Sequence, residues 1–259
     1  MKKILAIGLV LVLVLGMVAC GGGGEDTDAD VPVYKAITEA TFPPFDTVDE
    51  NGNVIGFDMD LIAAIGEDQG FKVEFVDMGF DALIPAIESG TGDIITAGMG
   101  ITEERAEKVD FTDTYYDSAL IVVVAADNET INSVDDLTAD MKVASQIATT
   151  GAGKVESLLA DGKIKEAVIL DGFDACMLQV INGDVEAVIV DEPVANAYMA
   201  KQPGKVKTVG DVMDAESYAF AVQKGNAELL EMINTGLQNV KDNGTYDELV
   251  MKWIAGETE

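Results

Sequence analysis

The feature that most constrains the fold of this 259-residue chain is an alternation of strand and helix patterns that occurs twice. In the first occurrence, residues 36–38 and 72–76 alternate like strands, and residues 57–68 between them have helical periodicity, with Asp58 expected to cap the helix. In the second, residues 142–190 contain strands at 142–145, 167–170 and 187–190, and helices at 149–161 and 173–181. Alternation of this kind is typical of α/β domains, so we expect two α/β lobes.

The segments around these patterns indicate how the two lobes are joined. We expect a helix at 80–89 and strands at 93–96 and 121–125, followed by a break at 127–130. A late strand at 218–222 and helices at 227–242 and 246–254 are expected to return to the first lobe. The chain then crosses between the lobes near 115–119 and 216–219, which makes a two-strand hinge. We therefore assign residues 33–116 and 218–259 to lobe 1 and residues 117–217 to lobe 2.

The N-terminal segment has the features of an export signal. Lys2 and Lys3 precede an apolar run from residue 4 to residue 19, which is shorter than the roughly 20 residues that a membrane-spanning helix needs. We expect residues 1–19 to be a cleaved signal peptide, with an uncleaved anchor as the alternative. Residues 20–32 are glycine-rich and then acidic, which is typical of a flexible tether.

Composition excludes several classes of function. The formal net charge is −31, so nucleic acid is not an expected partner, because proteins that follow a phosphate backbone need basic patches. The chain has no histidine, which removes Ser-His-Asp catalysis and any His-containing metal site. We expect no cofactor, no metal ion and no catalytic residue. The chain has two cysteines, and Cys176 is expected to be a buried structural thiol.

Arg105 is the only arginine of the chain, and it closes the segment 97–105 that follows the strand at 93–96. The planar guanidinium is well shaped to bind a carboxylate through parallel charge-assisted hydrogen bonds. Ligands of open α/β sheets bind at the ends of strands, which makes Arg105 a candidate ligand-binding residue. The alternative is a surface cation paired with Glu103, Glu104 or Glu107.

Two further motifs carry weaker signals. Residues 49–53 contain Asn-Gly, and we expect a tight turn there, because the spacing of the oxygen-bearing side chains does not match a calcium loop. Residues 149–154 suggest a phosphate-binding loop. They lack its first glycine and the Ser or Thr after the lysine, so that interpretation is weak.

Several phrases of the sequence together resemble a known family. They are residues 38–45, 56–61, 97–105, 110–113 with Tyr115 and Tyr116, 183–191 and 243–246. The chain resembles the bacterial extracellular solute-binding proteins of family 3, which supply polar amino acids to ABC importers. The resemblance implies a two-lobed, type II periplasmic-binding-protein-like α/β fold, a monomer, no enzymatic activity, and an ABC permease and ATPase as partners. Residues 17–20 also resemble the lipobox of bacterial lipoproteins, which implies a lipid on Cys20 and an extracytoplasmic, membrane-anchored protein.

The resemblance also implies a set of ligand-binding residues. Arg105 corresponds to the arginine that holds the α-carboxylate of the ligand, and Asp191 to the aspartate that holds its α-ammonium, although Asp191 could alternatively cap a helix ahead of Pro193. Gly98 matches the residue whose carbonyl accepts from the ammonium, and Thr149 and Thr150 match a pair that donates to the carboxylate. The remaining positions bind or select the ligand side chain, namely Phe42, Phe80, Glu39 and Gln146.

One position departs from the family pattern, and one affects the choice of ligand. Gly100 stands where the family commonly has Ser or Thr, so either water fills the gap or the ligand is a non-standard, amino-acid-like osmolyte. Glu39 would repel an anionic ligand side chain, so we expect a basic or neutral polar amino acid rather than glutamate or aspartate. Glu39 on a solvated rim is the alternative.

Two other classes of function compete with a binding protein. A few relatives of this fold act as dehydratases on cyclic amino-acid precursors, and Glu39 near Arg105 could then serve as the general acid. A sensor domain of a signalling receptor would require a membrane helix or an output domain, and we expect neither here.

Overall fold

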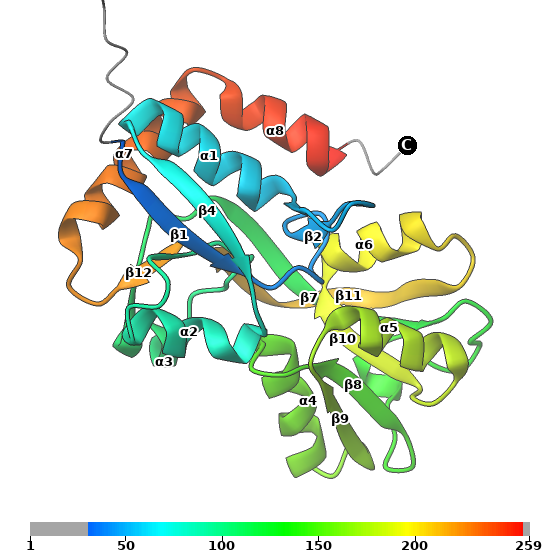
Figure 1. The fold of residues 1–259 in the computed structure, drawn as a ribbon. Coiled ribbons are helices and arrows are strands. Elements are labelled where there is room, and N and C mark those ends of the chain that lie inside the picture. The colour runs from blue at the N-terminus through cyan, green and yellow to red at the C-terminus, as the bar shows by residue number, and fades with distance from the viewer. Residues whose placement is uncertain (1–30, 256–259) are drawn as a thin grey trace, which may run out of the picture. The chain divides into compact units, whose positions relative to one another are not determined.

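The computed structural model describes residues 31–255, so the expected signal peptide, Cys20 and most of the tether lie outside the described residues. Within residues 31–255, strands form two five-stranded sheets and one two-stranded sheet, and helices cover the larger sheets (Figure 1). No helix in this range has both the length and the apolar character needed to cross a bilayer.

The first large sheet has the strand order β4-β1-β5-β12-β6. Strands β4 and β5 lie parallel to β1 on either side of it, and β12 is antiparallel to β5 and β6. The bounds of these strands are β1 Val33–Thr38, β4 Lys72–Asp77, β5 Ile94–Ile95, β6 Val109–Phe111 and β12 Ala221–Gln223.

The second large sheet has the strand order β11-β7-β10-β8-β9. Strands β10, β8 and β9 run parallel to one another, whereas β7 is antiparallel to both β10 and β11. The bounds are β7 Tyr116–Ala125, β8 Lys142–Gln146, β9 Glu166–Leu170, β10 Ala187–Asp191 and β11 Val206–Tyr218.

Helices cover both faces of the first sheet because its strand residues alternate between two apolar clusters. Ile94 packs in the cluster that contains α1 Phe57–Gln69 and α7 Ala227–Asp242, whereas the next residue, Ile95, packs in the cluster that contains α2 Phe80–Glu88. This is the period-two exposure of side chains on a strand, with both faces buried. Helix α8 Thr245–Trp253 contacts α1 and α7 on the outer side (Figure 1).

The second sheet is covered in the same way. In β7, Leu120, Val122 and Val124 pack in a cluster with Val155 of α4 Thr150–Ala160. The alternate residues Ile121 and Val123 pack on the opposite face, in the cluster that contains α5 Phe173–Asn182 and α6 Glu192–Lys201. Cys176 is a buried free thiol on α5, as expected.

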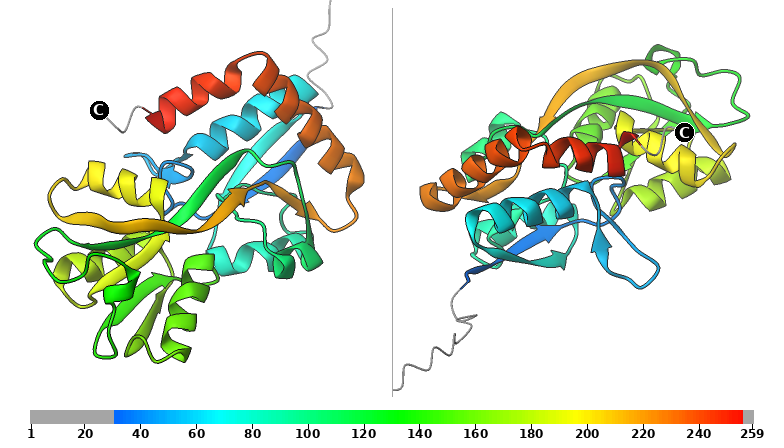
Figure 2. Two further views of the ribbon diagram at one scale, coloured as in Figure 1. Left: turned by 180° about the vertical axis from the view of Figure 1, so that it is seen from behind. Right: turned by 90° about the horizontal axis from the view of Figure 1, so that it is seen from above.

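The chain passes between the two large sheets twice. The chain leaves the first sheet after β6 and enters the second at β7, and it leaves the second sheet after β11 and returns to the first at β12. Strands β7 and β11 are antiparallel neighbours, from Tyr116 opposite Tyr218 to Ala125 opposite Val206. Figure 2 shows these two long strands side by side. The division at residues 116 and 218 stays a prediction.

Most strands and helices expected from sequence patterns are present, and the Asn-Gly turn joins the small hairpin β2 Thr47–Val48 and β3 Val54–Ile55. The strand expected at 218–222 is divided, because β11 ends at Tyr218 and β12 begins at Ala221. Helices α3 Glu103–Lys108 and α6, strand β6 and most of β11 were not expected. The expected cap of α1 by Asp58 is wrong, because the helix is capped by Gly56 and no side chain makes a capping hydrogen bond. Asp58 is buried instead and accepts hydrogen bonds from the Gly98 N–H at 2.8 Å and the Tyr115 hydroxyl at 2.6 Å.

The packing of α1 against the first sheet leads to a testable expectation. Leu61 is 0% exposed, so Leu61→Ala should lower the free energy of unfolding by about 2–5 kcal/mol through lost burial and a residual cavity. Leu178→Ala is the matched control, because Leu178 is 57% exposed and its truncation should cost less than about 0.5 kcal/mol. Urea unfolding followed by circular dichroism measures both; equal effects would contradict the assigned core.

Candidate functional site

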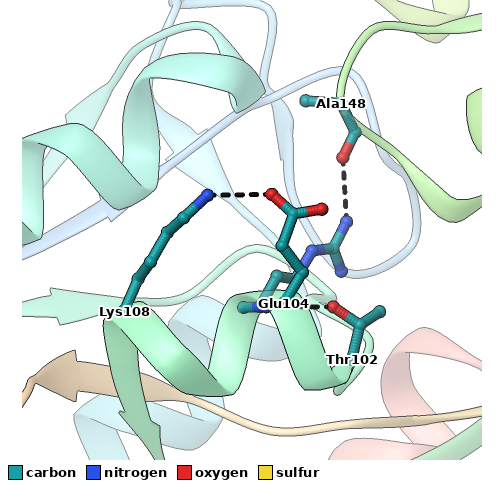
Figure 3. Close-up of polar contacts among 5 residues, drawn as sticks. Thr102, Glu104, Lys108 and Ala148 are labelled. Carbon is teal, nitrogen blue, oxygen red and sulfur yellow. Dashed lines mark hydrogen bonds and ion pairs between the residues drawn. The ribbon is translucent and has the colours of Figure 1, made fainter.

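Arg105 lies in a buried position on the short helix α3 Glu103–Lys108. The side chain of Thr102 caps this helix by accepting a hydrogen bond from the Arg105 N–H at 3.2 Å. The guanidinium donates from Nη1 to the Gly100 carbonyl at 2.6 Å. From Nη2 it donates to the Ala148 carbonyl at 2.9 Å (Figure 3). Gly100 follows the first sheet and Ala148 follows β8 of the second, so this side chain links elements of both sheets.

The surroundings of Arg105 exclude a surface ion pair. Its relative exposure is 9%, and Glu104 pairs instead with Lys108 at 2.9 Å on the exposed side of the helix (Figure 3). The ring of Phe80 lies 5.3 Å from the Arg105 Cζ, within the range of a cation–π contact. The alternative of a surface cation paired with a neighbouring glutamate is therefore wrong.

Asp191 is the last residue of β10 and the residue before α6. Its carboxylate is buried and accepts hydrogen bonds from the Tyr218 and Ser118 hydroxyls, the latter at 3.2 Å. It makes no capping hydrogen bond to α6, so the helix-cap alternative does not describe this side chain. Burial, and secondarily the charge of Glu216, raise the pKa of Asp191 to about 7.

Arg105 and Asp191 line one narrow cavity of about 10 Å³, which has room for about one water molecule. A larger open groove shares part of its wall, including Phe80, Arg105 and the two threonines. Nearly all of the ligand-binding residues expected from the sequence line the cavity, together with one residue that was not expected: Phe42, Phe80, Gly98, Gly100, Arg105, Gln146, Thr149, Thr150, Asp191 and Glu216.

Glu39 is the one expected residue that does not line the cavity. It is 6% exposed, so the alternative of a solvated rim residue is also wrong. Burial raises its pKa, and hydrogen bonds from Gln146 and Thr41 lower it. Since Gln146 does line the cavity, Glu39 contacts the site through the Gln146 amide.

The start of α4 supplies the two threonines. Thr149 is the N-cap, and its hydroxyl accepts from the Ala152 N–H at 3.0 Å and donates to the Gln146 carbonyl at 2.7 Å. That hydroxyl proton is therefore already used within the protein, in contrast to the expected donation to a ligand. Thr150, the first residue of this helix, lines the cavity together with Glu216. The free N–H groups of the first helical turn remain suited to an anion.

Gly98 is required by its backbone conformation and a close approach, whereas at Gly100 the close neighbour is the movable end of a side chain. Gly98 has φ of 50°, in the left-handed region, and a Cβ there would lie 2.5 Å from the Phe42 ring. A Cβ on Gly100 would lie 2.5 Å from Glu216 Oε2. The space left by the missing Ser or Thr side chain is thus occupied by a carboxylate of the chain itself, and neither a water nor an unusual ligand is needed to fill it.

Glu216 was missed because β11 has no clear apolar alternation. From Gly210 to Glu216 the residues of this strand are half-buried or exposed, so the period-two signal that marks the other strands is absent. Burial raises the pKa of Glu216, while the Thr150 hydrogen bond and the Arg105 charge lower it.

Comparison with known proteins agrees with this arrangement. Residues 34–256 match the family model of the bacterial extracellular solute-binding proteins, family 3. The chain belongs to this family. It is 34% identical over 263 residues to a probable histidine-binding protein of Neisseria gonorrhoeae, covering 99% of this chain and 97% of the relative.

Solved structures of the solute-binding fold are similar as well. An ancestral arginine-binding protein bound to arginine has a TM-score of 0.82 and 43% identity over 85% of this chain and 97% of its own. An ancestral amino acid-binding protein that is a precursor of cyclohexadienyl dehydratase has a TM-score of 0.79 and 38% identity, over 86% of this chain and 95% of its own. The expected two-lobed α/β fold is confirmed.

The buried Asp191 carboxylate leads to a pH-dependent expectation for the ligand-free protein. An acid whose pKa is raised to about 7 by folding binds its proton more tightly in the folded state, so its contribution to stability is present below its ordinary pKa and is lost as the pH rises through about 7. Asp191→Asn should therefore reduce the loss of stability between pH 5 and pH 8.

Urea unfolding at both pH values measures this difference. Asp214→Asn is the matched control, because Asp214 is an exposed carboxylate that pairs with Lys154 at 2.8 Å. If Asp191→Asn and the unaltered protein lose the same stability over this range, the burial of an ionised Asp191 is not destabilising.

Proposed function

We propose that this solute-binding protein captures a basic or neutral polar amino acid outside the cytoplasmic membrane and delivers it to the permease and ATPase of an ABC importer. The observation that carries the proposal is the position of Arg105 and Asp191 at one small cavity. The arginine belongs to elements beside the first sheet and the aspartate to the second, so a zwitterion between them bridges the two halves of the fold.

The charges of the site match the backbone of an amino acid. The Arg105 guanidinium and the N-terminal turn of α4 suit the α-carboxylate, while Asp191 and the Gly98 carbonyl suit the α-ammonium. Charge-assisted hydrogen bonds contribute roughly 1.5–3 kcal/mol each, and micromolar affinity requires about 8 kcal/mol. A few such contacts are sufficient. Since the α-carboxylate and the α-ammonium of the ligand reach oppositely charged partners together only when both halves meet the ligand, binding favours the closed state.

Several contacts already join the two halves around the cavity. The Tyr198 hydroxyl of α6 donates to the Thr41 carbonyl at 3.0 Å, and the Phe173 N–H at the start of α5 donates to Thr41 Oγ1, also at 3.0 Å. Together with the bond from Arg105 to Ala148, they support a hinged pair of lobes composed of residues 33–116 with 218–259 and residues 117–217.

The surroundings of the cavity favour a cationic ligand side chain. Asp191, Glu216 and, through Gln146, Glu39 contribute three carboxyl groups, against the single guanidinium of Arg105. The aromatic rings of Phe42 and Phe80 suit the apolar part or the cation of such a side chain. Relatives whose names specify histidine and arginine support the same preference.

We further propose that the protein is not an enzyme and that it is monomeric. Its relatives are named as binding proteins, although one similar structure is a precursor of a dehydratase. The dehydratase alternative depends on Glu39, which lies behind Gln146 rather than in the cavity wall. We also propose a lipid anchor on Cys20; a mass increase of that cysteine in the membrane fraction would test it.

Replacement of Arg105 tests the proposed function. Arg105→Ala should raise the Kd for the bound amino acid by about 100-fold or more, because both the charge and the paired hydrogen bonds to the carboxylate are lost. Calorimetry with arginine, histidine, glutamine and glutamate on the unaltered protein first identifies the ligand. Mass spectrometry of the recovered ligand, unchanged for a binding protein, separates the function from dehydration.

Lys108→Ala is the matched control for that experiment, because Lys108 is an exposed cation on the same helix and pairs only with Glu104 among the described salt bridges. It should leave the Kd unchanged within about twofold. Equal Kd values for the Arg105 variant and the unaltered protein would rule out the carboxylate role.

Glu39 tests the preference for a basic ligand. Glu39→Gln should weaken the binding of arginine more than that of glutamine, by roughly five- to tenfold in Kd. The substitution removes one negative charge near the side-chain end of the cavity while retaining the capacity to hydrogen-bond to Gln146. Glu104→Gln, an exposed acid, is the control, and calorimetric Kd values are the measurement. The same loss for both ligands would mean that Glu39 does not select by charge.

A further inference from the structure

Glu216 occupies the part of the cavity in which the proposed function places the ligand carboxylate. Its Oε2 lies 2.5 Å from the point at which a Cβ of residue 100 would stand, and Arg105 Nη1 lies 3.8 Å from the same point. Thr150, at the start of α4, lines the same cavity. Glu216 therefore lies in the same cavity as the guanidinium and the helix start that suit an α-carboxylate.

The electrostatic environment of Arg105 also involves Glu216. Burial lowers the pKa of Arg105, and the charge of Glu216, followed by those of Asp191 and Glu104, raises it. The bond that Arg105 makes across the cavity goes to the Ala148 carbonyl, which carries no net charge. In the ligand-free protein, Glu216 is thus an acidic side chain beside the buried guanidinium in the cavity wall.

We propose that the Glu216 carboxyl group occupies the place of the ligand carboxylate beside Arg105 when the cavity is empty and is displaced when an amino acid binds. This assignment rests on the proposed function. Two carboxylates at one guanidinium repel each other, so the ligand carboxylate and Glu216 compete for the same position. Glu216 consequently lowers the affinity for ligands that carry a carboxylate and favours amines that lack one.

A second groove can accommodate the displaced Glu216 side chain. Glu216 also lines a second, open groove, whose wall includes Lys154, Asp214 and Thr150. Lys154 Nζ lies 2.8 Å from Asp214 there and offers a cation to a second carboxylate. A rotation of the Glu216 side chain therefore exchanges one cationic partner for another while the backbone of β11 stays in register with β7.

The distinguishing experiment compares amino acids with their decarboxylated amines. Glu216→Gln should bind L-arginine on the order of tenfold more tightly than the unaltered protein, because the competing charge is removed. The same substitution should leave agmatine, which is arginine without its carboxylate, bound no more tightly than before. L-histidine and histamine form a second pair, and calorimetry supplies each Kd.

Asp211→Asn is the matched control, since Asp211 is an exposed acid on the same strand and lines neither the cavity nor the second groove. This substitution removes the same formal charge, and it should change the Kd of neither ligand pair by more than about twofold. Unchanged or weaker arginine binding by Glu216→Gln, or an equal gain for arginine and agmatine, would overturn the assignment.

A ligand-free measurement separates this assignment from the proposed function. In a double-mutant cycle, Glu216→Gln and Arg105→Gln should be non-additive in urea unfolding, because each removes the other's buried partner. The pair Asp211→Asn and Arg105→Gln should be additive. Additive effects for the Glu216 pair would reject the contact, whereas a protein that binds no amino acid but shows this coupling would reject only the proposed function.

Discussion

The buried guanidinium of Arg105 is the interaction on which the rest of the site depends. An ion removed from water is costly unless hydrogen bonds and opposite charges replace the lost hydration. The chain provides them from both of its sheets, with the Gly100 carbonyl on one side and the Ala148 carbonyl on the other. Ala148 has φ of 62°, a left-handed conformation that costs a residue with a Cβ about 1–2 kcal/mol and is characteristic of ligand-binding loops.

The acids around this guanidinium outnumber it, and their properties follow from that imbalance. Burial disfavours the charged form of Asp191, Glu216 and Glu39, so the pKa of each is raised. Each proton taken up reduces the negative charge of the empty cavity. A ligand with a second cation does the same without protonation. The electrostatics of the empty site and the proposed preference for a basic amino acid are then two consequences of one charge distribution.

The sequence predicted those features that depend on regular apolar patterns or on the sequence motifs of the family. Two strand and helix repeats located both sheets, and the segment 97–105 located Arg105 at a strand end. It did not predict that Asp58 would accept a hydrogen bond from the Gly98 N–H instead of capping α1, because an aspartate at the start of a helix is compatible with either interaction. Nor did it predict Glu216, which has no apolar neighbours in alternation and reaches the site only because β11 pairs with β7.

Strand β11 therefore does more than join the two sheets. Glu216 and Tyr218 are two residues apart, so their side chains leave the strand on the same face. Glu216 approaches Arg105 and Thr150, and the Tyr218 hydroxyl donates to Asp191. One connecting strand thus contacts both charged anchors of the cavity at the point where the chain returns to the first sheet. A change in the bend of β11 that accompanies opening must alter the partners of the cation and of the anion together, which couples the electrostatics of the site to the relative position of its two halves.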